Sequence, residues 1–135
     1  MKRNNMFMLA AIFLVVAVFL VLNGMRGEVA IVDTPDFTDI SSAQLDAMMQ
    51  NKDFTLINVH IPYDGEIENT DLSIPYTEIS SLDLDKDAKI VLYCRSGSMS
   101  EVAAKELVAR GYTNVYNLKN GMNEWKVHIR DLIRK

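Results

Sequence analysis

Length, composition and charge narrow the kinds of protein this chain can be. It has 135 residues, 49% of them hydrophobic, and a formal net charge of −4 at pH 7, so it can form one domain with at most a short appendage. The first 27 residues contain bases and no acid, which leaves the remainder strongly acidic and argues against a nucleic-acid partner. The single cysteine, Cys94, excludes an internal disulfide and a multi-cysteine metal site. With only His60 and His128 besides it, we expect no metal site.

The N-terminal segment is predicted to enter a membrane. Lys2 and Arg3 precede 17 consecutive hydrophobic residues, Met6 to Leu22, which as a helix would span about 25 Å. The run is longer than the hydrophobic region of a typical signal peptide, and large residues occupy the candidate cleavage sites after it. We expect residues 1–27 to be one uncleaved transmembrane helix. The alternative is a cleaved signal segment and a secreted product.

The charges that flank this run predict its orientation. Lys2, Arg3 and the terminal amine outweigh Arg26, so the positive-inside rule keeps the N-terminus in the cytoplasm. The chain would then be a single-pass membrane protein with its domain on the extracytoplasmic, periplasmic side. We expect residues 28–36 to form a spacer and residues 37–135 to form the folded domain.

The domain sequence alternates between predicted strands and helices, which is typical of a parallel sheet covered on both faces. The predicted strands are Thr55–Val59, Lys89–Tyr93 and Asn114–Leu118. The second of them is a continuous hydrophobic run, as expected for a strand in the middle of such a sheet. Residues 61–74, with their prolines and acids, are expected to form a long loop.

Helix signals occupy the intervals between these strands. A capping box at Ser41 and Gln44 predicts a helix up to Asn51. The other predicted helices are a short one within Ile79–Leu84, one over Met99–Arg110 that stops at Gly111, and a final one that carries Trp125. The tail from Lys126 to Lys135 is expected to be a helix packed on the domain, and the alternative is a segment that docks a partner.

Cys94 directly follows the strongest predicted strand, at the edge where parallel sheets bind ligands. The segment Cys94-Arg95-Ser96-Gly97-Ser98-Met99 leads into a helix, whose amides and positive end would hold an anion and favour a thiolate. Gly97 permits the tight turn, Ser98 and Glu101 form a second capping box with Ser98 as N-cap, and Arg95 adds positive charge at the rim. The competing interpretation is a buried, unreactive cysteine.

The sequence around Cys94 resembles the active-site loop of single-domain rhodaneses. The segment Val91–Gly97 carries the resemblance through its Cys-Arg-Ser-Gly motif. The segments Gly111–Leu118 and Gly121–Trp125 are similar to the strand and turn that follow the loop in that family. A weaker match to the family's upstream motif is found in Leu56–His60 and Gly65–Ile67. The resemblance implies a rhodanese-like α/β fold, a five-stranded parallel sheet with helices on both faces, preceded here by the predicted transmembrane helix.

The resemblance also implies a chemistry and a set of site residues. Cys94 would take sulfane sulfur from thiosulfate, a persulfide or a polysulfide, become a persulfide, and pass the sulfur to a thiophilic acceptor. The substrate-binding residues would be Arg95, Ser96, Gly97, Ser98 and Met99. The partners would be small sulfur-bearing anions or thiols, with a protein acceptor as a further candidate, and the reaction would need no cofactor.

Two departures from the family pattern keep a second interpretation open. Asn58-Val59-His60 stands where the family usually has Asp-Val-Arg, and Met99 stands where many members carry a second arginine. With fewer cations, the chain would instead be a catalytically weak rhodanese module that binds a partner or senses oxidants at the membrane. Phosphatases of the same fold need an arginine six residues after the cysteine. Ser100 occupies that position, which argues against phosphate ester hydrolysis.

Overall fold

A computed structural model of the chain describes residues 36–134. The predicted membrane segment, residues 1–27, and all of the predicted spacer except Asp36 lie outside this range. Among the described residues, no helix combines the length and the hydrophobicity needed to cross a bilayer.

The described residues form a five-stranded parallel sheet, which confirms the predicted fold class. The strands are β1 (Thr38–Ile40), β2 (Thr55–Asn58), β3 (Leu72–Ser73), β4 (Ile90–Tyr93) and β5 (Val115–Leu118). Their spatial order is β1-β5-β4-β2-β3, and every neighbouring pair is parallel. All strands therefore end at the same edge of the sheet, and β4, whose four residues are all buried, lies in its middle.

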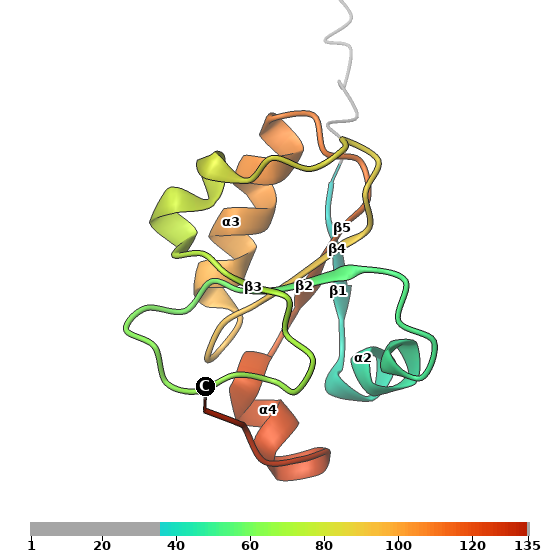
Figure 1. Cartoon of the computed structure of the whole chain (residues 1–135), viewed down its shortest axis with the longest axis vertical. Coiled ribbons are helices and arrows are strands. Elements are labelled where there is room, and N and C mark those ends of the chain that lie inside the picture. Colours follow the sequence, from blue (N-terminus) through green and yellow to red (C-terminus); the bar gives the residue numbers. More distant parts are fainter. Residues whose placement is uncertain (1–35, 135) are drawn as a thin grey trace, which may run out of the picture. The chain divides into compact units, whose positions relative to one another are not determined.

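Helices cover both faces of the sheet, as predicted (Figure 1). The helix α3 (Ser98–Ala109) and the 3-10 helix η1 (Tyr76–Ser81) pack on one face, and α2 (Ser42–Met49) and α4 (Gly121–His128) pack on the other. Two hydrophobic clusters fill the spaces between the layers. One cluster includes Leu92 and Leu107, and the other includes Tyr93 and Trp125. Alternate β4 side chains thus point to opposite cores, as the period of a strand requires.

Local signals explain where two of the helices begin and end. The capping box of α2 is formed as predicted, because the Ser41 side chain accepts from the Gln44 amide at 3.2 Å and the Gln44 side chain accepts from the Ser41 amide at 2.8 Å. Gly111 ends α3 with a φ of +89°, and its amide donates to the Val108 carbonyl at 2.9 Å. Only glycine adopts such a backbone conformation without strain.

The two short edge strands and η1 depart from the sequence expectations. β1 precedes the first predicted helix, and β3 lies within residues 61–74, which were expected to be all loop. Both strands are short and mostly exposed, so they lack the hydrophobic run that marks a buried strand. The helix expected within Ile79–Leu84 is the 3-10 helix η1, which starts earlier because Pro75 fixes the chain at its N-cap.

The predicted helical tail is wrong beyond His128. There the chain leaves α4 and pairs with the loop after β2, where Glu66 and Ile133 form an antiparallel bridge with amide-to-carbonyl distances of 2.9 and 2.8 Å. Arg130 holds the same segment by ion pairs with Asp46 at 3.1 Å and Glu68 at 3.5 Å. These tertiary bonds outweigh the helical spacing that the tail sequence suggests.

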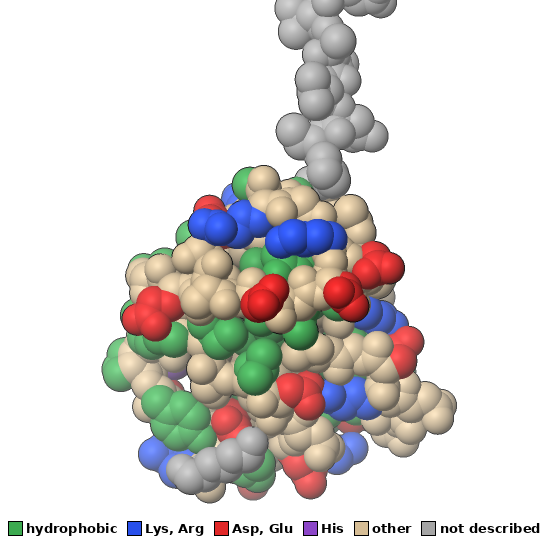
Figure 2. All heavy atoms as spheres, turned by 45° about the horizontal axis from the view of Figure 1, so that its top comes forward, with side chains coloured by type: hydrophobic (Ala, Val, Ile, Leu, Met, Phe, Trp, Pro, Cys, Tyr) green, Lys and Arg blue, Asp and Glu red, His purple; other side chains and the backbone are tan. Residues whose placement is uncertain are grey.

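One face of the described domain carries charges of both signs. In Figure 2, acidic and basic side chains lie near one another around exposed hydrophobic side chains. Helix α3 carries two exposed ion pairs, Lys105 with Glu101 at 2.6 Å and Arg110 with Glu106. Such exposed pairs add little to stability, so the two hydrophobic clusters hold the fold together.

Candidate functional site: the Cys94 loop

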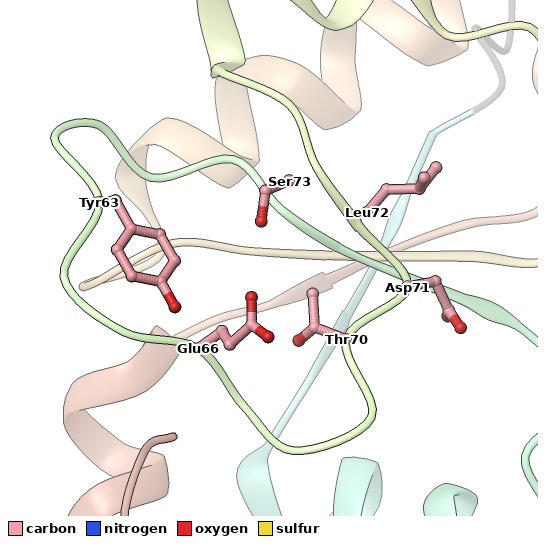
Figure 3. Close-up of a pocket in the computed structure, with 6 residues that line it drawn as sticks. All are labelled: Tyr63, Glu66, Thr70, Asp71, Leu72 and Ser73. Atoms are coloured by element: carbon pink, nitrogen blue, oxygen red, sulfur yellow. The ribbon is translucent and has the colours of Figure 1, made fainter. Parts of the chain in front are cut away.

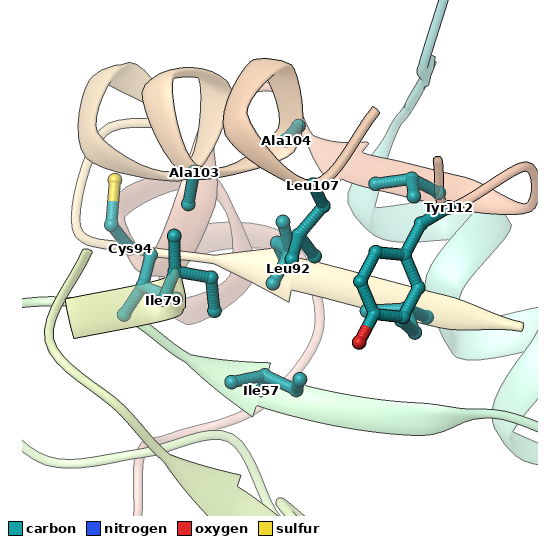
Figure 4. Close-up of a cluster of buried hydrophobic side chains, with 11 residues drawn as sticks. Ile57, Ile79, Leu92, Cys94, Ala103, Ala104, Leu107 and Tyr112 are labelled. Carbon is teal, nitrogen blue, oxygen red and sulfur yellow. The ribbon is translucent and has the colours of Figure 1, made fainter. Parts of the chain in front are cut away.

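Cys94 is the first residue after β4 and lies at the edge where all five strands end. Its side chain belongs to the hydrophobic cluster between the sheet and α3 and is only 1% exposed. Figure 4 shows its sulfur atom pointing toward the first turn of α3 rather than into the centre of the cluster. The thiol therefore forms the floor of the loop that connects β4 to α3.

Two hydrogen-bond donors reach the sulfur of Cys94. The Gly97 amide donates to Sγ at 3.1 Å, and the Ser100 hydroxyl lies 3.5 Å from Sγ. The same hydroxyl lies 3.0 Å from the Gly97 carbonyl. Because a hydroxyl has one proton, Ser100 can turn it from the carbonyl to the sulfur when the sulfur carries negative charge.

The rest of the loop forms an exposed rim above the thiol. Arg95, Ser96 and Ser98 are exposed, whereas Gly97 is buried. Met99 is half-buried and packs against the cluster that contains Cys94. The six consecutive residues predicted for the site thus occupy the connection from β4 to α3, Cys94–Gly97, and the first two positions of α3, Ser98 and Met99. Arg95 is the one residue with a permanent positive charge within it.

The second capping box that the sequence predicts is not formed. The N-cap of α3 is Gly97, with a φ of +95°, and Ser98 is already the first helical residue. The Ser98 hydroxyl contacts the Ser96 hydroxyl at 3.4 Å, and Glu101 forms an ion pair with Lys105. The glycine turns the chain one residue earlier than a serine cap would, and this turn directs the Gly97 amide at the sulfur.

Two glycines fix the loop against the turn between β5 and α4. A side-chain carbon at Gly97 would lie 1.8 Å from the Lys119 carbonyl oxygen, and one at Gly121 would lie 2.3 Å from the Cys94 carbonyl oxygen. The first amides of α4 complete the contact, because Met122 donates to the Cys94 carbonyl at 2.9 Å and Asn123 donates to the Arg95 carbonyl at 3.0 Å. The backbone of the loop is thus held by the turn between β5 and α4 as well as by α3.

Asn58 is the last residue of β2, and His60 follows it by two residues beside this loop. Asn58 pairs in register with Tyr93, and the Val59 amide donates to the Tyr93 carbonyl at 2.9 Å, so His60 lies next to the start of the loop. Asn58 is 2% exposed, and its side chain bonds to the His60 amide and the Gly65 carbonyl. Asn58 thus has a structural role, while His60 remains half-buried at the rim.

The protonation of His60 is biased by its surroundings. Burial lowers the pKa of its imidazole, the Asp64 carboxylate raises it, and the Arg95 guanidinium lowers it. The net direction is below the ordinary value of about 6.5, so the ring is neutral near pH 7. His60 therefore does not replace the cation that the family usually has at this position.

A separate hollow lies beyond this loop, next to the edge strand β3 (Figure 3). It encloses about 350 Å³ and is lined by Tyr63, Glu66, Thr70, Asp71, Leu72 and Ser73. Tyr63, Glu66 and Thr70 point toward one another across it. The hollow does not include Cys94. Among the described residues, no group of three or more histidine, cysteine, aspartate or glutamate side chains is arranged to hold a metal ion.

Ser100 and the α4 amides are site elements that sequence reasoning did not identify. Ser100 does carry a recognisable pattern, because it starts the buried face of α3, whose other members are Ala103, Ala104 and Leu107. A buried serine in that series needs a hydrogen-bond partner, and the Cys94 thiol lies six residues earlier in the sequence. The α4 contact has no such pattern, since it depends on how β5 returns the chain to the loop.

Comparison with known proteins places this loop in a family. Residues 41–128 match the rhodanese-like domain. A sulfurtransferase of Allochromatium vinosum is 31% identical over 85 residues, which are 60% of this chain and 79% of that protein. A tRNA uridine(34) hydroxylase of Erwinia tasmaniensis is 28% identical over 102 residues, but the chain spans only 29% of its length.

Solved structures show the same fold. A rhodanese-related protein of Thermoplasma volcanium matches with a TM-score of 0.62 and 23% identity, and the match covers 73% of this chain and 100% of that one. A rhodanese-like domain protein of Staphylococcus aureus matches with a TM-score of 0.61 and 22% identity, with the same coverage. Because the family match covers well over half of the 135 residues, the chain belongs to the rhodanese-like domain family.

Proposed function

We propose that the chain is a sulfurtransferase or sulfur carrier that moves sulfane sulfur through a persulfide on Cys94. The observation that carries the proposal is the position of Sγ, which lies at the N-terminus of α3 and accepts from the Gly97 amide at 3.1 Å. The α3 dipole and this amide both favour negative charge on sulfur. Family membership and the sulfurtransferase relative support the same chemistry.

In the first step, the Cys94 thiolate attacks the outer, sulfane sulfur of the donor. A bond forms between Sγ and that sulfur while the donor's own bond to it breaks, and the electron pair leaves with sulfite or a thiolate. The new terminal sulfur is anionic. The first amides of a helix have no acceptor within the helix, so those of α3 can stabilise this charge together with the Ser100 hydroxyl.

In the second step, a thiophilic acceptor attacks the terminal sulfur. The bond between Sγ and that sulfur breaks, and its electron pair returns to Cys94 as the thiolate. The same donors that stabilised the persulfide stabilise this leaving group. No step needs a metal or an organic cofactor, because one cysteine both accepts and releases the sulfur. The proposed acceptors are small thiols and anions or the thiol of a partner protein.

The rim decides which donors can approach. Cys94 is almost completely covered, so a donor has to reach it over the exposed residues Arg95, Ser96 and Ser98. Arg95 offers one positive charge to an anionic donor, and Met99 offers an apolar surface where many relatives have a cation. We therefore propose that the site uses persulfides and polysulfides as well as thiosulfate, and that thiosulfate binds weakly.

The location of the reaction is proposed from the sequence alone. The hydrophobic run from Met6 to Leu22 and the basic residues before it favour a membrane anchor with the domain outside the cytoplasm. The sulfur acceptors would then be extracytoplasmic.

The test compares sulfur transfer by the full-length chain and by Cys94→Ser. Each protein is incubated with thiosulfate or an organic persulfide and then with a thiol acceptor, and the transferred sulfur is measured. Because the chain has one cysteine, no second thiol contributes a background. We expect transfer by the wild type and none by Cys94→Ser. Equal transfer by both proteins would refute the proposal, and no transfer by the wild type would favour the module that binds partners or senses oxidants.

A further inference from the structure

We propose that His60 is a catalytic base for thiol substrates: it accepts the proton of the thiol that attacks the Cys94 persulfide. This inference rests on the proposed function and specifies its substrate class, a protonated thiol rather than an anion.

The sheet register brings His60 to the cysteine loop. β2 and β4 are neighbours, with Ile57 opposite Leu92 and Asn58 opposite Tyr93. The pairing continues for one more residue through the bond from the Val59 amide to the Tyr93 carbonyl. His60 therefore lies at the same level as the first residues of the loop, at the edge where the strands end and a substrate of Cys94 has to approach.

The backbone amide of His60 is anchored by the buried side chain of Asn58. Its amide donates to the Asn58 side-chain oxygen at 3.0 Å, and the Asn58 amide group donates to the Gly65 carbonyl at 3.2 Å. Next to Gly65, Glu66 is bridged to Ile133 of the C-terminal tail by two backbone hydrogen bonds. This bracing fixes where the imidazole begins, which is what a group that must meet a substrate requires.

Within the part of the chain that the structure describes, no structural hydrogen bond engages one nitrogen of the imidazole ring. Its Nδ1 atom is buried and has no hydrogen-bond partner among residues 36–134. The charged groups that act on the ring are Asp64, which faces Arg134 of the tail at 3.9 Å, and Arg95 of the loop. Burial and Arg95 together outweigh Asp64 and lower the pKa of the imidazole, so its neutral, proton-accepting form prevails near pH 7.

A neutral imidazole at this place fits a thiol acceptor and not an anionic donor. Alkyl thiols are mostly protonated near pH 7 and must lose that proton as their sulfur attacks. In the proposed step His60 takes the proton, the acceptor sulfur bonds to the terminal sulfur of the persulfide, and the bond to Sγ breaks with its electron pair staying on Cys94. His60 then returns the proton to the Cys94 thiolate or to water. Loading from thiosulfate involves no such proton.

The test separates loading of Cys94 from its discharge in the full-length chain. His60→Gln is compared with the wild type and with His128→Asn, which removes the exposed histidine at the end of α4. Loading from thiosulfate should be the same in all three proteins. Discharge to an alkyl thiol should fall about hundredfold in His60→Gln, whereas discharge to an aryl thiol already ionised at the assay pH should not change. The wild-type rate with the alkyl thiol should lose activity at acidic pH as His60 becomes protonated, and the variant should lack this inflection.

An unchanged discharge to the alkyl thiol in His60→Gln would overturn the inference, and so would an equal loss with the alkyl and the aryl thiol or a loss of loading, since these indicate a structural role. Should the glutamine variant fail to fold by its Trp125 fluorescence, His60→Asn supplies the same comparison, and failure of both to fold would also identify a structural residue. A wild type that accepts no sulfur would refute the proposed function and this inference with it.

Discussion

Replacing Gly97 by alanine should unfold or rearrange the cysteine loop. The structure indicates how far the loop would have to move and how much unfolding free energy would be lost. Gly97 has a φ of +95°, where an L-residue is strained, and its new side-chain carbon would lie 1.8 Å from the Lys119 carbonyl oxygen. Such contacts are essentially never shorter than 3.0 Å, so the two segments would have to separate by more than 1 Å. The Lys119 segment resists this movement because its amide donates to the Ile40 carbonyl at 3.0 Å.

Gly111 supplies a matched control for this substitution. Its φ is +89°, nearly the same, yet a side-chain carbon there would meet no atom within 4 Å. Gly111→Ala should therefore cost only the backbone strain, about 1–2 kcal/mol. Gly97→Ala adds the collision and disturbs the amide that bonds to Cys94 Sγ, so its cost should be about 3–5 kcal/mol.

The assay is urea unfolding of the full-length variants, followed by the fluorescence of Trp125, the one tryptophan, which is 1% exposed. The difference between the two variants, about 1–4 kcal/mol, measures the collision together with the disturbed Gly97 amide. Gly97→Ala should also lose sulfur loading, and Gly111→Ala should retain it. Equal free energies of unfolding for the two variants would refute the close approach of the loop to the turn after β5.

Three further predictions concern donor choice, acid stability and location. Met99→Arg would place a guanidinium beside the loop, where it can form a charge-assisted hydrogen bond with thiosulfate. The KM for thiosulfate should fall roughly tenfold to hundredfold, whereas the KM for an organic persulfide should not fall. No change with either donor would mean that position 99 does not face the substrate. Ser42 donates twice to Glu124, which lowers the pKa of that carboxyl. Glu124→Gln should therefore destabilise the fold near pH 7, and its difference from the wild type in urea unfolding should shrink below about pH 4, because the Glu124 contribution is lost as the carboxyl is protonated; a difference independent of pH would contradict this. The full-length chain should stay in the membrane fraction after alkaline carbonate extraction, whereas a soluble product that starts between Gly24 and Glu28 would show cleavage instead.

The central elements of the fold could be predicted because their local patterns and their tertiary environments agree. β4 is a hydrophobic run that is buried on both faces, and the α2 capping box uses two side chains three residues apart. β1 and β3 could not be predicted, since edge strands this short are defined by their neighbours. The conformation of the tail after His128 is set by the bridge between Ile133 and Glu66, and the spacing of hydrophobic residues in the tail does not reveal this contact.

In the candidate site, too, local features could be predicted from the sequence, whereas features that depend on tertiary contacts could not. The Cys-Arg-Ser-Gly segment and its place after a strand could be predicted from the sequence, and the structure brings these residues into one loop. The capping rule predicts Ser98 as the N-cap because a glutamate follows it three residues later, whereas in the structure Gly97 makes the turn one residue earlier. Ser100 and the α4 amides act through contacts made only when β4, α3 and α4 come together.

The intact mass of the full-length chain after exposure to thiosulfate or an organic persulfide shows directly whether Cys94 accepts sulfur. We predict a gain equal to one sulfur atom, located on Cys94 by fragmentation, absent in Cys94→Ser, and lost again when a thiol acceptor is added. A chain that gains no sulfur from either donor, or that gains it equally in Cys94→Ser, would contradict the central claim that the α3 N-terminus holds a persulfide-forming cysteine.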